Sequence, residues 1–295
     1  MEYQVTANGI QLAYETFGPD HPKTILLISG LGTQMVRWSE SFCHRLSDHG
    51  FRVIRFDNRD TGRSSHLTER GVPDFKAWEE MLREGMRPPV AYSLHDMSDD
   101  VIGLLDALSL DCVHVVGRSM GGMIAQILAS EHPNRVASLT SIMSSTGNPE
   151  LPGSDPEVFA MMTQPTPDPF MDMPNFLAHR MTFARRIAGT GFPFDEDRHR
   201  EIAMEEFRRS YDPGGTLRQM AAIAVTGDRR PRLRSISAPT LIIHGSDDPL
   251  FLPACGLDSA ASIPNAELMM IEGMGHDLPL DLEAPIAEAI KRIAS

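Results

Sequence analysis

Short runs of consecutive apolar residues recur along the chain and alternate with segments of helical periodicity. The runs TILLIS (24–29) and FRVIRFD (51–57) are interpreted as buried strands, because such runs suit strands covered on both faces of a parallel sheet. Further strands are predicted at 112–116, 136–143, 240–244 and 267–271, and helices at 38–49, 94–108, 121–131, 253–261 and 284–293. Strands that alternate with helices predict a parallel sheet with helices on both sides.

The start of the chain has a different pattern. Asn8 and Gly9 separate two runs in which polar and apolar residues alternate, between residues 3 and 17. Both residues tolerate the positive φ that a two-residue hairpin turn requires, so the sheet is predicted to begin with an antiparallel pair.

Residues 145–237 break the alternation of strands and helices. No apolar run there resembles a buried strand, prolines follow one another closely, and other stretches have the pattern of amphipathic helices. We therefore expect a helical cap at 145–237, inserted between two strands of a core that comprises 1–144 and 238–295. Because the insertion follows a strand end, it should lie above the edge where open α/β sheets bind ligands.

Composition and charge narrow the functional classes. Apolar residues make up 41% and charged residues 23% of the chain, which fits a globular protein and not a disordered one. The net charge of -13 comes from 40 acidic and 27 basic residues, and the basic ones are scattered. Nucleic acid is not expected as a partner, because neutralising phosphates needs a concentrated positive surface.

The chain has no stretch of about 18 apolar residues and no basic leader followed by an apolar run. We therefore expect no membrane partner and a cytoplasmic location, with the choice between a monomer and a homodimer left open. The three cysteines are far apart and form no C-x-x-C pair, so neither a metal site nor a redox site is predicted. Cys112 opens a predicted strand and is expected to be buried.

The sequence GRSMG, residues 117–121, places Ser119 between a predicted strand and a predicted helix. This is the context of the nucleophile elbow G-x-S-x-G, in which the glycines allow close packing around a strained turn. The serine hydroxyl then projects above the sheet as a nucleophile. The backbone N–H of Met120, at the start of the helix, is free to bind an oxyanion.

A serine hydroxyl needs a base that takes its proton during attack. His276 is the candidate, because it follows the last predicted strand in a glycine-containing loop that can place the imidazole over the sheet edge. A carboxylate should orient this histidine, and Asp248, after the preceding strand, is favoured over its neighbour Asp247. The order Ser119, Asp248, His276 is characteristic of α/β-hydrolases. His244 lies inside a predicted strand and is interpreted as structural.

A second oxyanion donor is expected in the loop that follows residue 28, where Gly30 allows a sharp turn. The backbone N–H of Leu31 is the candidate, and that of Gly32 is the alternative. Gly30 is also expected to border the substrate pocket.

Five segments occur in an order that is typical of one large family: ISGLG (28–32), RFDNRDTGRSS (55–65), VVGRSMGGMIA (115–125), LIIHGSDDPL (241–250) and GMGHDLP (273–279). The chain resembles the α/β-hydrolase superfamily, and most of all its aclacinomycin methylesterase group. The resemblance implies an α/β-hydrolase fold: a mostly parallel eight-stranded sheet, flanking helices and a helical cap. It also implies a serine carboxylic ester hydrolase without metal or coenzyme, acting through an acyl-enzyme on a small or medium, largely apolar ester.

Two positions depart from the family pattern. Ser29 stands where the family often has histidine, and Arg118 fills an elbow position that often holds a small, aromatic or apolar residue. Arg118 is interpreted either as a group that binds a substrate carboxylate or as part of an ion pair with the surrounding loops. In the family the segment DNRDTGRS mainly shapes a loop beside the active site, so Asp57, Arg59 and Arg63 are expected to be structural.

The cap is expected to select the substrate. Its methionine and phenylalanine side chains, with Met161, Phe170 and Met181 as candidates, would either line an apolar pocket or pack the cap helices on the core. Other serine chemistries on this fold stay open, namely lactone hydrolysis, carbon-carbon bond hydrolysis and cofactor-free perhydrolysis. A non-catalytic small-molecule binder is a further alternative, because some proteins with this fold only bind ligands.

Overall fold

Eight strands form one sheet in the computed structural model, which describes residues 1–78, 80, 81 and 83–295 in full. Their order across the sheet is β1-β2-β4-β3-β5-β6-β7-β8, and β3 to β8 run parallel. The strands are β1 (Glu2–Ala7), β2 (Ile10–Phe17), β3 (Lys23–Ile28), β4 (Phe51–Phe56), β5 (Val113–Arg118), β6 (Val136–Ile142), β7 (Thr240–Gly245) and β8 (Glu267–Ile271). The predicted eight-stranded, mostly parallel sheet is confirmed.

The alternation of side chains along the strands builds two cores. Asn8 and Gly9 have φ values of 47° and 77°, as the predicted hairpin turn between β1 and β2 requires. In β3, Leu26 packs in one large buried cluster, whereas its neighbour Leu27 packs in another. Successive side chains of a strand point to opposite faces, so the two clusters lie on the two faces of the sheet.

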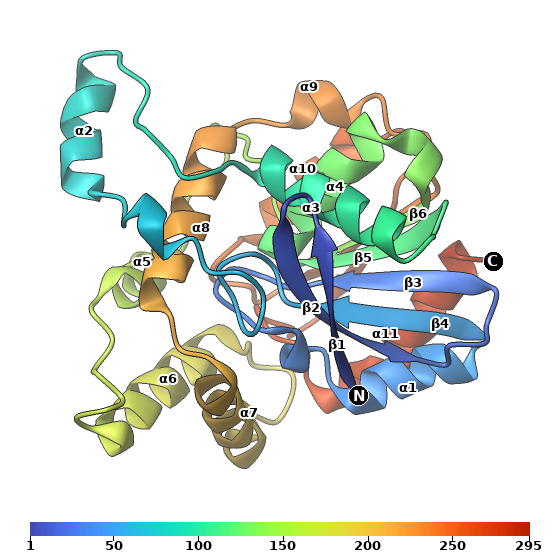
Figure 1. Ribbon diagram of the computed structural model, residues 1–295, viewed down its shortest axis with the longest axis horizontal. Coiled ribbons are helices and arrows are strands. Elements are labelled where there is room, and N and C mark those ends of the chain that lie inside the picture. The colour runs from blue at the N-terminus through green and yellow to red at the C-terminus, as the bar shows by residue number, and fades with distance from the viewer.

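Helices cover both faces of the sheet (Figure 1). The helices α1 and α11 pack together on one face, whereas α3, α4 and α10 cover the other. These helices are α1 (Glu40–Asp48), α3 (Leu94–Ala107), α4 (Met120–Glu131), α10 (Pro253–Ser262) and α11 (Leu280–Ile293), so the five predicted core helices are confirmed. A further helix that we did not predict, α2 (Phe75–Arg83), stands apart from the sheet in Figure 1.

Five helices lie between β6 and β7 in the chain. They are α5 (Pro156–Thr163), α6 (Met173–Ile187), α7 (Glu196–Arg209), α8 (Pro213–Thr226) and α9 (Arg230–Leu233). The side chains of Asp155, Asp172 and Asp195 accept backbone N–H bonds at the starts of α5, α6 and α7. Helices α5 to α8 lie at the carboxyl ends of the parallel strands (Figure 1), which supports the proposal that residues 145–237 form a cap.

A buried carboxylate ties these helices to the core. Glu206 of α7 accepts two hydrogen bonds from Arg37, in the segment after β3, and one from Arg180 of α6, all at 2.7–2.8 Å. Burial raises the pKa of Glu206, but the charges and hydrogen bonds of the two arginines outweigh it and lower the pKa from 4.5 to about 2. The ionised carboxylate therefore stabilises the contact of α6 and α7 with the segment after β3.

Glu206→Gln is expected to lower the free energy of unfolding at neutral pH by about 3 kcal/mol, because each unit of pKa shift is worth about 1.4 kcal/mol. The folded-state pKa is lowered, so this contribution is complete above pH 4.5 and is lost as the pH falls toward 2. The difference between wild type and variant should therefore shrink by about 1 kcal/mol over the first pH unit below 4.5, measured by urea unfolding. A difference that stays constant with pH would contradict this role of the ionised Glu206.

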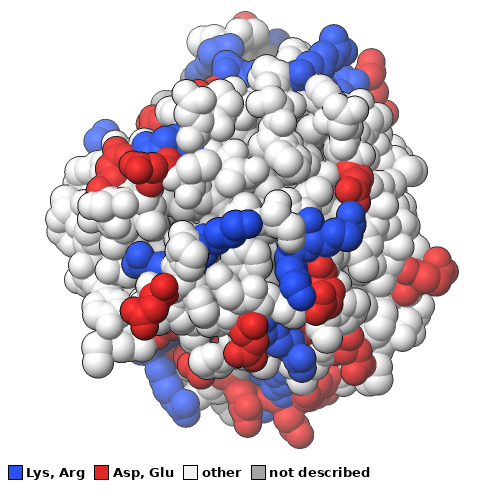
Figure 2. Space-filling model, turned by 90° about the vertical axis from the view of Figure 1, so that its right-hand side faces the viewer, with Lys and Arg blue, Asp and Glu red and all other residues white. Residues whose placement is uncertain are grey.

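The face opposite α5, α6 and α7 carries mixed charges. Figure 2 views the molecule from the right-hand side of Figure 1, and its lysine and arginine side chains are interspersed with acidic and uncharged ones. Within the described part of the chain, no helix is both long enough and apolar enough to span a membrane.

The prediction that Cys112 is buried is wrong. Its side chain is exposed, because β5 begins one residue later, at Val113, and Cys112 lies in the connection that follows α3. Cys43 and Cys255 are buried.

Candidate active site

Ser119 lies in the tight turn between β5 and α4. Its φ of 54° and ψ of -121° are unusual for a residue with a side chain, as expected for a nucleophile elbow. A Cβ atom on Gly117 would lie 2.1 Å from the carbonyl oxygen of Gly121, and one on Gly121 would lie 2.2 Å from that of Ile28. The turn therefore cannot form with larger residues at these two positions.

The structure brings the three predicted triad residues together. Ser119 Oγ lies 3.0 Å from His276 Nε2, and His276 Nδ1 lies 2.8 Å from Asp248 Oδ2. The three residues follow β5, β8 and β7, which are parallel and end at the same edge of the sheet. With its own proton on Nδ1, His276 can accept the serine proton at Nε2 while the carboxylate stabilises the imidazolium that results.

The carboxylate of Asp248 is held at both oxygens. Oδ1 accepts the backbone N–H groups of Leu250 and Phe251, each at 2.9 Å, and Oδ2 faces His276. Asp248 is buried, whereas Asp247 is only half-buried and accepts hydrogen bonds from a residue between β6 and β7. This arrangement favours Asp248 over Asp247 as the partner of the histidine.

His244 is fully buried in β7, close to this carboxylate. Its Nε2 donates to the carbonyl oxygen of Phe251 at 2.7 Å and lies 3.7 Å from Asp248 Oδ2. Burial lowers the pKa of His244, which keeps the ring neutral. A Cβ atom on Gly256 would lie 2.6 Å from His244, so α10 packs directly against the histidine. These contacts fit the structural role expected for His244.

Residues between β6 and β7 also hold the loop that carries His276. The backbone N–H of His276 donates to the carbonyl oxygen of Ile187, the last residue of α6, at 2.6 Å, and the N–H of Gly275 donates to that of Ala188 at 3.2 Å. The imidazole meets the ring of Phe251 edge-on, with centroids 5.5 Å apart. Sequence patterns did not indicate these contacts, because they join segments that are far apart in the chain.

The backbone N–H groups of Leu31 and Met120 are the two predicted oxyanion donors, and both remain free to donate. In the described part of the chain, no acceptor is found for the N–H of Met120, which begins α4, or for that of Leu31. The carbonyl oxygen of Gly30 accepts the N–H and the hydroxyl of Thr33 at 3.3 and 3.0 Å. Because the peptide is planar and trans, the N–H of Leu31 points away from that oxygen. A Cβ atom on Gly30 would lie 3.2 Å from Ser119 Cβ, so this loop passes beside the nucleophile.

Gln219 of α8 distinguishes between the two alternatives for the second donor. Its Oε1 accepts the N–H of Gly32 at 2.8 Å, which leaves Leu31 as the residue with a free amide. Its Nε2 donates to the carbonyl oxygen of Arg59 and to the hydroxyl of Thr61, both at 2.7 Å. The side chain is fully buried and its amide bridges two loops of the core. No sequence motif marks this residue, and we did not predict it.

The surroundings of Ser29 show why such an anchor is needed. The hydroxyl of Ser29 is buried and, within the described residues, has no hydrogen-bond partner, while its carbonyl oxygen accepts Asn58 Nδ2 at 3.1 Å. The side chain of Ser29 therefore does not hold this loop by a hydrogen bond to any described residue. Gln219 and Thr33 hold the loop instead.

Gln219→Met is expected to lower kcat by about 10- to 100-fold with a smaller change in KM, because oxyanion donors act mainly in the transition state. Without its anchor, the loop places the N–H of Leu31 less accurately against the oxyanion. Steady-state kinetics on an ester checks this, with Gln164→Met, at an exposed position, as the matched control. A loss of thermal stability without a change in kcat would contradict the positioning role.

The predicted structural residues of the 57–64 segment form ion pairs. Asp57 accepts Arg209 Nη2 at 2.5 Å, and Arg59 binds Asp100 with two hydrogen bonds of 2.6 Å each. Arg63 pairs with an acidic residue of β1 at 3.0 Å. This placement fits the structural role expected for all three.

The candidate pocket residues lie in three different surroundings. Met181 is buried in a small cluster with Phe176, which matches the packing alternative, and Met161 is half-buried on α5. Phe170 is 74% exposed, and its ring lies against that of Phe207 with centroids 5.4 Å apart. The placement of Phe170 does not fit a buried apolar pocket, whereas a pocket role for Met161 stays a prediction.

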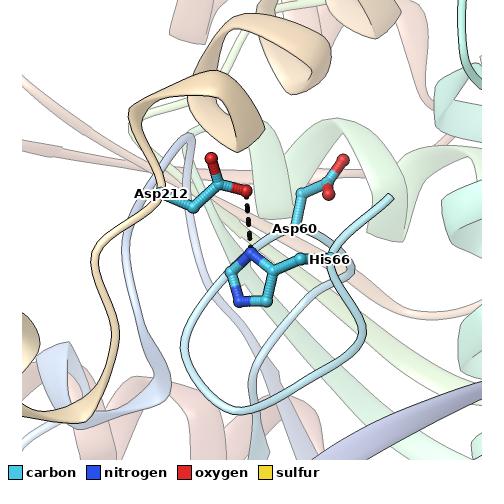
Figure 3. Close-up of side chains that lie close together, drawn as sticks. All are labelled: Asp60, His66 and Asp212. Carbon is cyan, nitrogen blue, oxygen red and sulfur yellow. Dashed lines mark hydrogen bonds and ion pairs between the residues drawn. The ribbon is translucent and has the colours of Figure 1, made fainter. Parts of the chain in front are cut away.

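Two aspartates and a histidine cluster where α8 meets the core (Figure 3). Ligand atoms of Asp60, His66 and Asp212 lie within 4.8 Å of one another, a spacing compatible with a metal ion. However, Arg218 donates to both oxygens of Asp60 at 2.8 Å and to Asp212 at 2.9 Å. The hydroxyl of Tyr92 adds a bond to Asp60 at 2.6 Å. The guanidinium already supplies the cation, so the cluster is an ion-pair network that fastens α8 to the core.

Sequence comparison identifies the family. The model of a family described as alpha/beta hydrolase fold matches residues 23–281. The chain therefore belongs to the α/β-hydrolase family, and the resemblance found in its motifs is confirmed.

Relatives with assigned names are similar over nearly the whole chain. The rhodomycin D methylesterase DauP of Streptomyces sp. (strain C5) is 30% identical, covering 97% of this chain and 95% of that protein. The putative carbamate hydrolase RutD of Serratia proteamaculans (strain 568) is also 30% identical, covering 89% of this chain and 88% of that protein. Among solved structures, the enol-lactonase from Burkholderia xenovorans LB400 matches with a TM-score of 0.72 at 22% identity, covering 99% of both chains. At that identity the likeness concerns the fold alone.

Proposed function

We propose that this protein is a serine carboxylic ester hydrolase. The observation that carries the proposal is the hydrogen-bonded series from Asp248 through His276 to Ser119, with the free amides of Leu31 and Met120 beside the serine. The backbone of Ser119 has a positive φ of 54°, which costs stability in a residue with a side chain. Such strained residues cluster at functional sites, which supports a functional role for Ser119.

In the proposed mechanism, Ser119 Oγ attacks the ester carbonyl carbon while His276 Nε2 takes the hydroxyl proton. The carbonyl oxygen becomes an oxyanion that accepts hydrogen bonds from the amides of Leu31 and Met120. His276 then gives its proton to the departing alcohol, which leaves an acyl-enzyme on Ser119. Water activated by His276 cleaves the acyl-enzyme and releases the acid, and Asp248 keeps the histidine in the required tautomer throughout.

We propose a small or medium, largely apolar ester as the substrate, with a methyl ester as the first to test. Support comes from the two rhodomycin D methylesterases, DauP and DnrP, each 30% identical over 97% of this chain. Methanol is a small leaving alcohol, and the proposed steps need neither a metal nor a coenzyme. The same residues can hydrolyse lactones or diketones, or transfer an acyl group to hydrogen peroxide to form a peracid, so rates must separate these alternatives.

Covalent labelling followed by turnover assays tests the proposal. A fluorophosphonate should modify the protein, and peptide mass spectrometry should locate the adduct on Ser119. Rates with methyl esters, p-nitrophenyl esters, lactones and vinylogous diketones then rank the chemistries. A folded protein that is neither labelled nor active on any of these compounds would be a non-catalytic small-molecule binder, and the proposal would be wrong.

A further inference from the structure

Arg118 is a buried arginine without an acidic partner. Its exposed fraction is 9%, and it occupies the last position of β5, directly before Ser119. Within the described residues, no carboxylate oxygen lies within 4.0 Å of its guanidinium. Its hydrogen bond to the protein runs from Nη1 to the carbonyl oxygen of Arg37 at 3.4 Å, and the guanidinium lies over the ring of Trp38. The ion pair that was one of the two interpretations of Arg118 is therefore not formed.

Other buried arginines of the chain are satisfied by protein atoms. Arg59 pairs with Asp100 at 2.6 Å. Arg229 has no carboxylate partner in hydrogen-bond range, yet its guanidinium donates to three protein oxygens at 2.6–3.3 Å. An unsatisfied buried cation costs free energy, so the open donors of Arg118 need another explanation.

Arg118 lines a cavity between α7 and the loop that follows β8. This cavity has a volume of about 10 Å³, and its lining includes Arg37, Arg118, Arg198, His199 and Asp277. A second cavity of about 150 Å³ shares Arg198, His199 and Asp277 with it, so the two adjoin. A small polar group thus has a place against Arg118, with space beside it for the rest of a ligand.

Positive charge exceeds negative charge around this cavity. The three carboxylates beside it are Asp277, which lines it, and Glu206 and Glu283, which pair with the lining residues Arg37 and Arg198. The lining guanidinium groups are Arg37, Arg118 and Arg198, and Arg180 also pairs with Glu206. The larger cavity has two further carboxylates in its lining, Asp195 and Asp281. Each of the three carboxylates is already paired with a group other than Arg118. Burial, together with the nearby charge of Arg37, lowers the pKa of Arg118 to about 10, as expected for an incompletely compensated cation.

We propose that this cavity binds a carboxylate group distinct from the ester that Ser119 attacks. A guanidinium presents parallel N–H donors that match a carboxylate, and an anion here supplies the missing negative charge. Arg118 directly precedes Ser119 and Asp277 directly follows His276 in the chain, so the cavity is lined by residues of the two segments that carry the reacting side chains. The carboxylate belongs either to the substrate or to a free carboxylic acid. The first source rests on the proposed function, whereas the second does not.

Binding of acetate to the full chain tests the site without catalysis. At constant ionic strength, titration calorimetry should show saturable binding of acetate and none of acetamide, its neutral analogue. Arg118→Met should weaken acetate binding by at least about tenfold, because a charge-assisted bidentate contact is lost. The matched control is Arg234→Met, at an exposed position. If Arg118→Met does not fold, Arg118→Lys replaces it, because lysine keeps the charge but lacks the fork.

Kinetics on a pair of esters identifies the source of the carboxylate. Wild type should favour monomethyl glutarate over methyl pentanoate by about tenfold or more in kcat/KM, through a lower KM, and Arg118→Met should remove that preference. Acetate binding without such a preference assigns the site to a free acid. Acetate binding by a protein that hydrolyses neither ester, is inactive on the wider panel and is not labelled by a fluorophosphonate supports this site and contradicts the proposed function. No saturable acetate binding, or equal binding by wild type and Arg118→Met, overturns the site.

Discussion

Ser119→Ala is expected to lower kcat/KM for a methyl or p-nitrophenyl ester by about 10⁴-fold or more, because the acyl-enzyme can no longer form. The residual rate should come from the amides of Leu31 and Met120, which still stabilise the oxyanion when water attacks directly. The assay follows release of acid or p-nitrophenol at substrate concentrations well below KM. Labelling by a fluorophosphonate should disappear together with the activity.

Ser237→Ala is the matched control, because Ser237 is exposed. It should keep the rate and the labelling of wild type. Circular dichroism should show that Ser119→Ala is folded, since alanine fits the space of serine in the turn. Turnover at the wild-type rate by folded Ser119→Ala would show that another residue is the nucleophile.

The sheet and the convergence of Ser119, Asp248 and His276 were predictable because their signals are local. Each of these three residues follows a strand by a few positions, and parallel strands bring their carboxyl ends to one edge. The elbow adds a steric requirement that only glycine meets at Gly117 and Gly121. The wrong prediction of a buried Cys112 came from the position of the strand end, which the sequence pattern does not fix to one residue. Because β5 begins at Val113, Cys112 lies just outside the strand and is exposed.

The supports of the site could not be predicted, because they depend on contacts across the chain. Gln219 reaches Gly32 over 187 positions, and the carbonyl oxygen of Ile187 fixes the backbone of His276. Neither residue belongs to a motif. An apolar residue type alone also does not predict which side chains of residues 145–237 are buried. Met181 is buried, whereas Phe170 is exposed. Side chains in such helices face solvent or protein according to packing that periodicity alone does not specify.

Asp248→Asn is expected to lower kcat by about 10⁴-fold, through the tautomer of His276. The backbone N–H groups of Leu250 and Phe251 donate to Oδ1, so the oxygen of the asparagine must stay on that side. Its NH₂ group then faces His276 Nδ1, which has to be the acceptor. The proton of the imidazole moves to Nε2, and the ring can no longer take the proton of Ser119.

Asp247→Asn is the control for this prediction, because it makes the same chemical change one residue away. Asp247 is half-buried and faces Thr190 instead of the histidine, so this variant should keep a kcat close to that of wild type. Both variants lose one negative charge at the same strand end. A difference in kcat between them therefore cannot come from the loss of charge alone. If Asp247→Asn were the inactive one, the hydrogen bond of 2.8 Å between Asp248 and His276 would not be the interaction that sets the tautomer. If both variants kept their activity, the orientation of His276 would depend on Ile187 and Phe251, which hold its backbone and its ring.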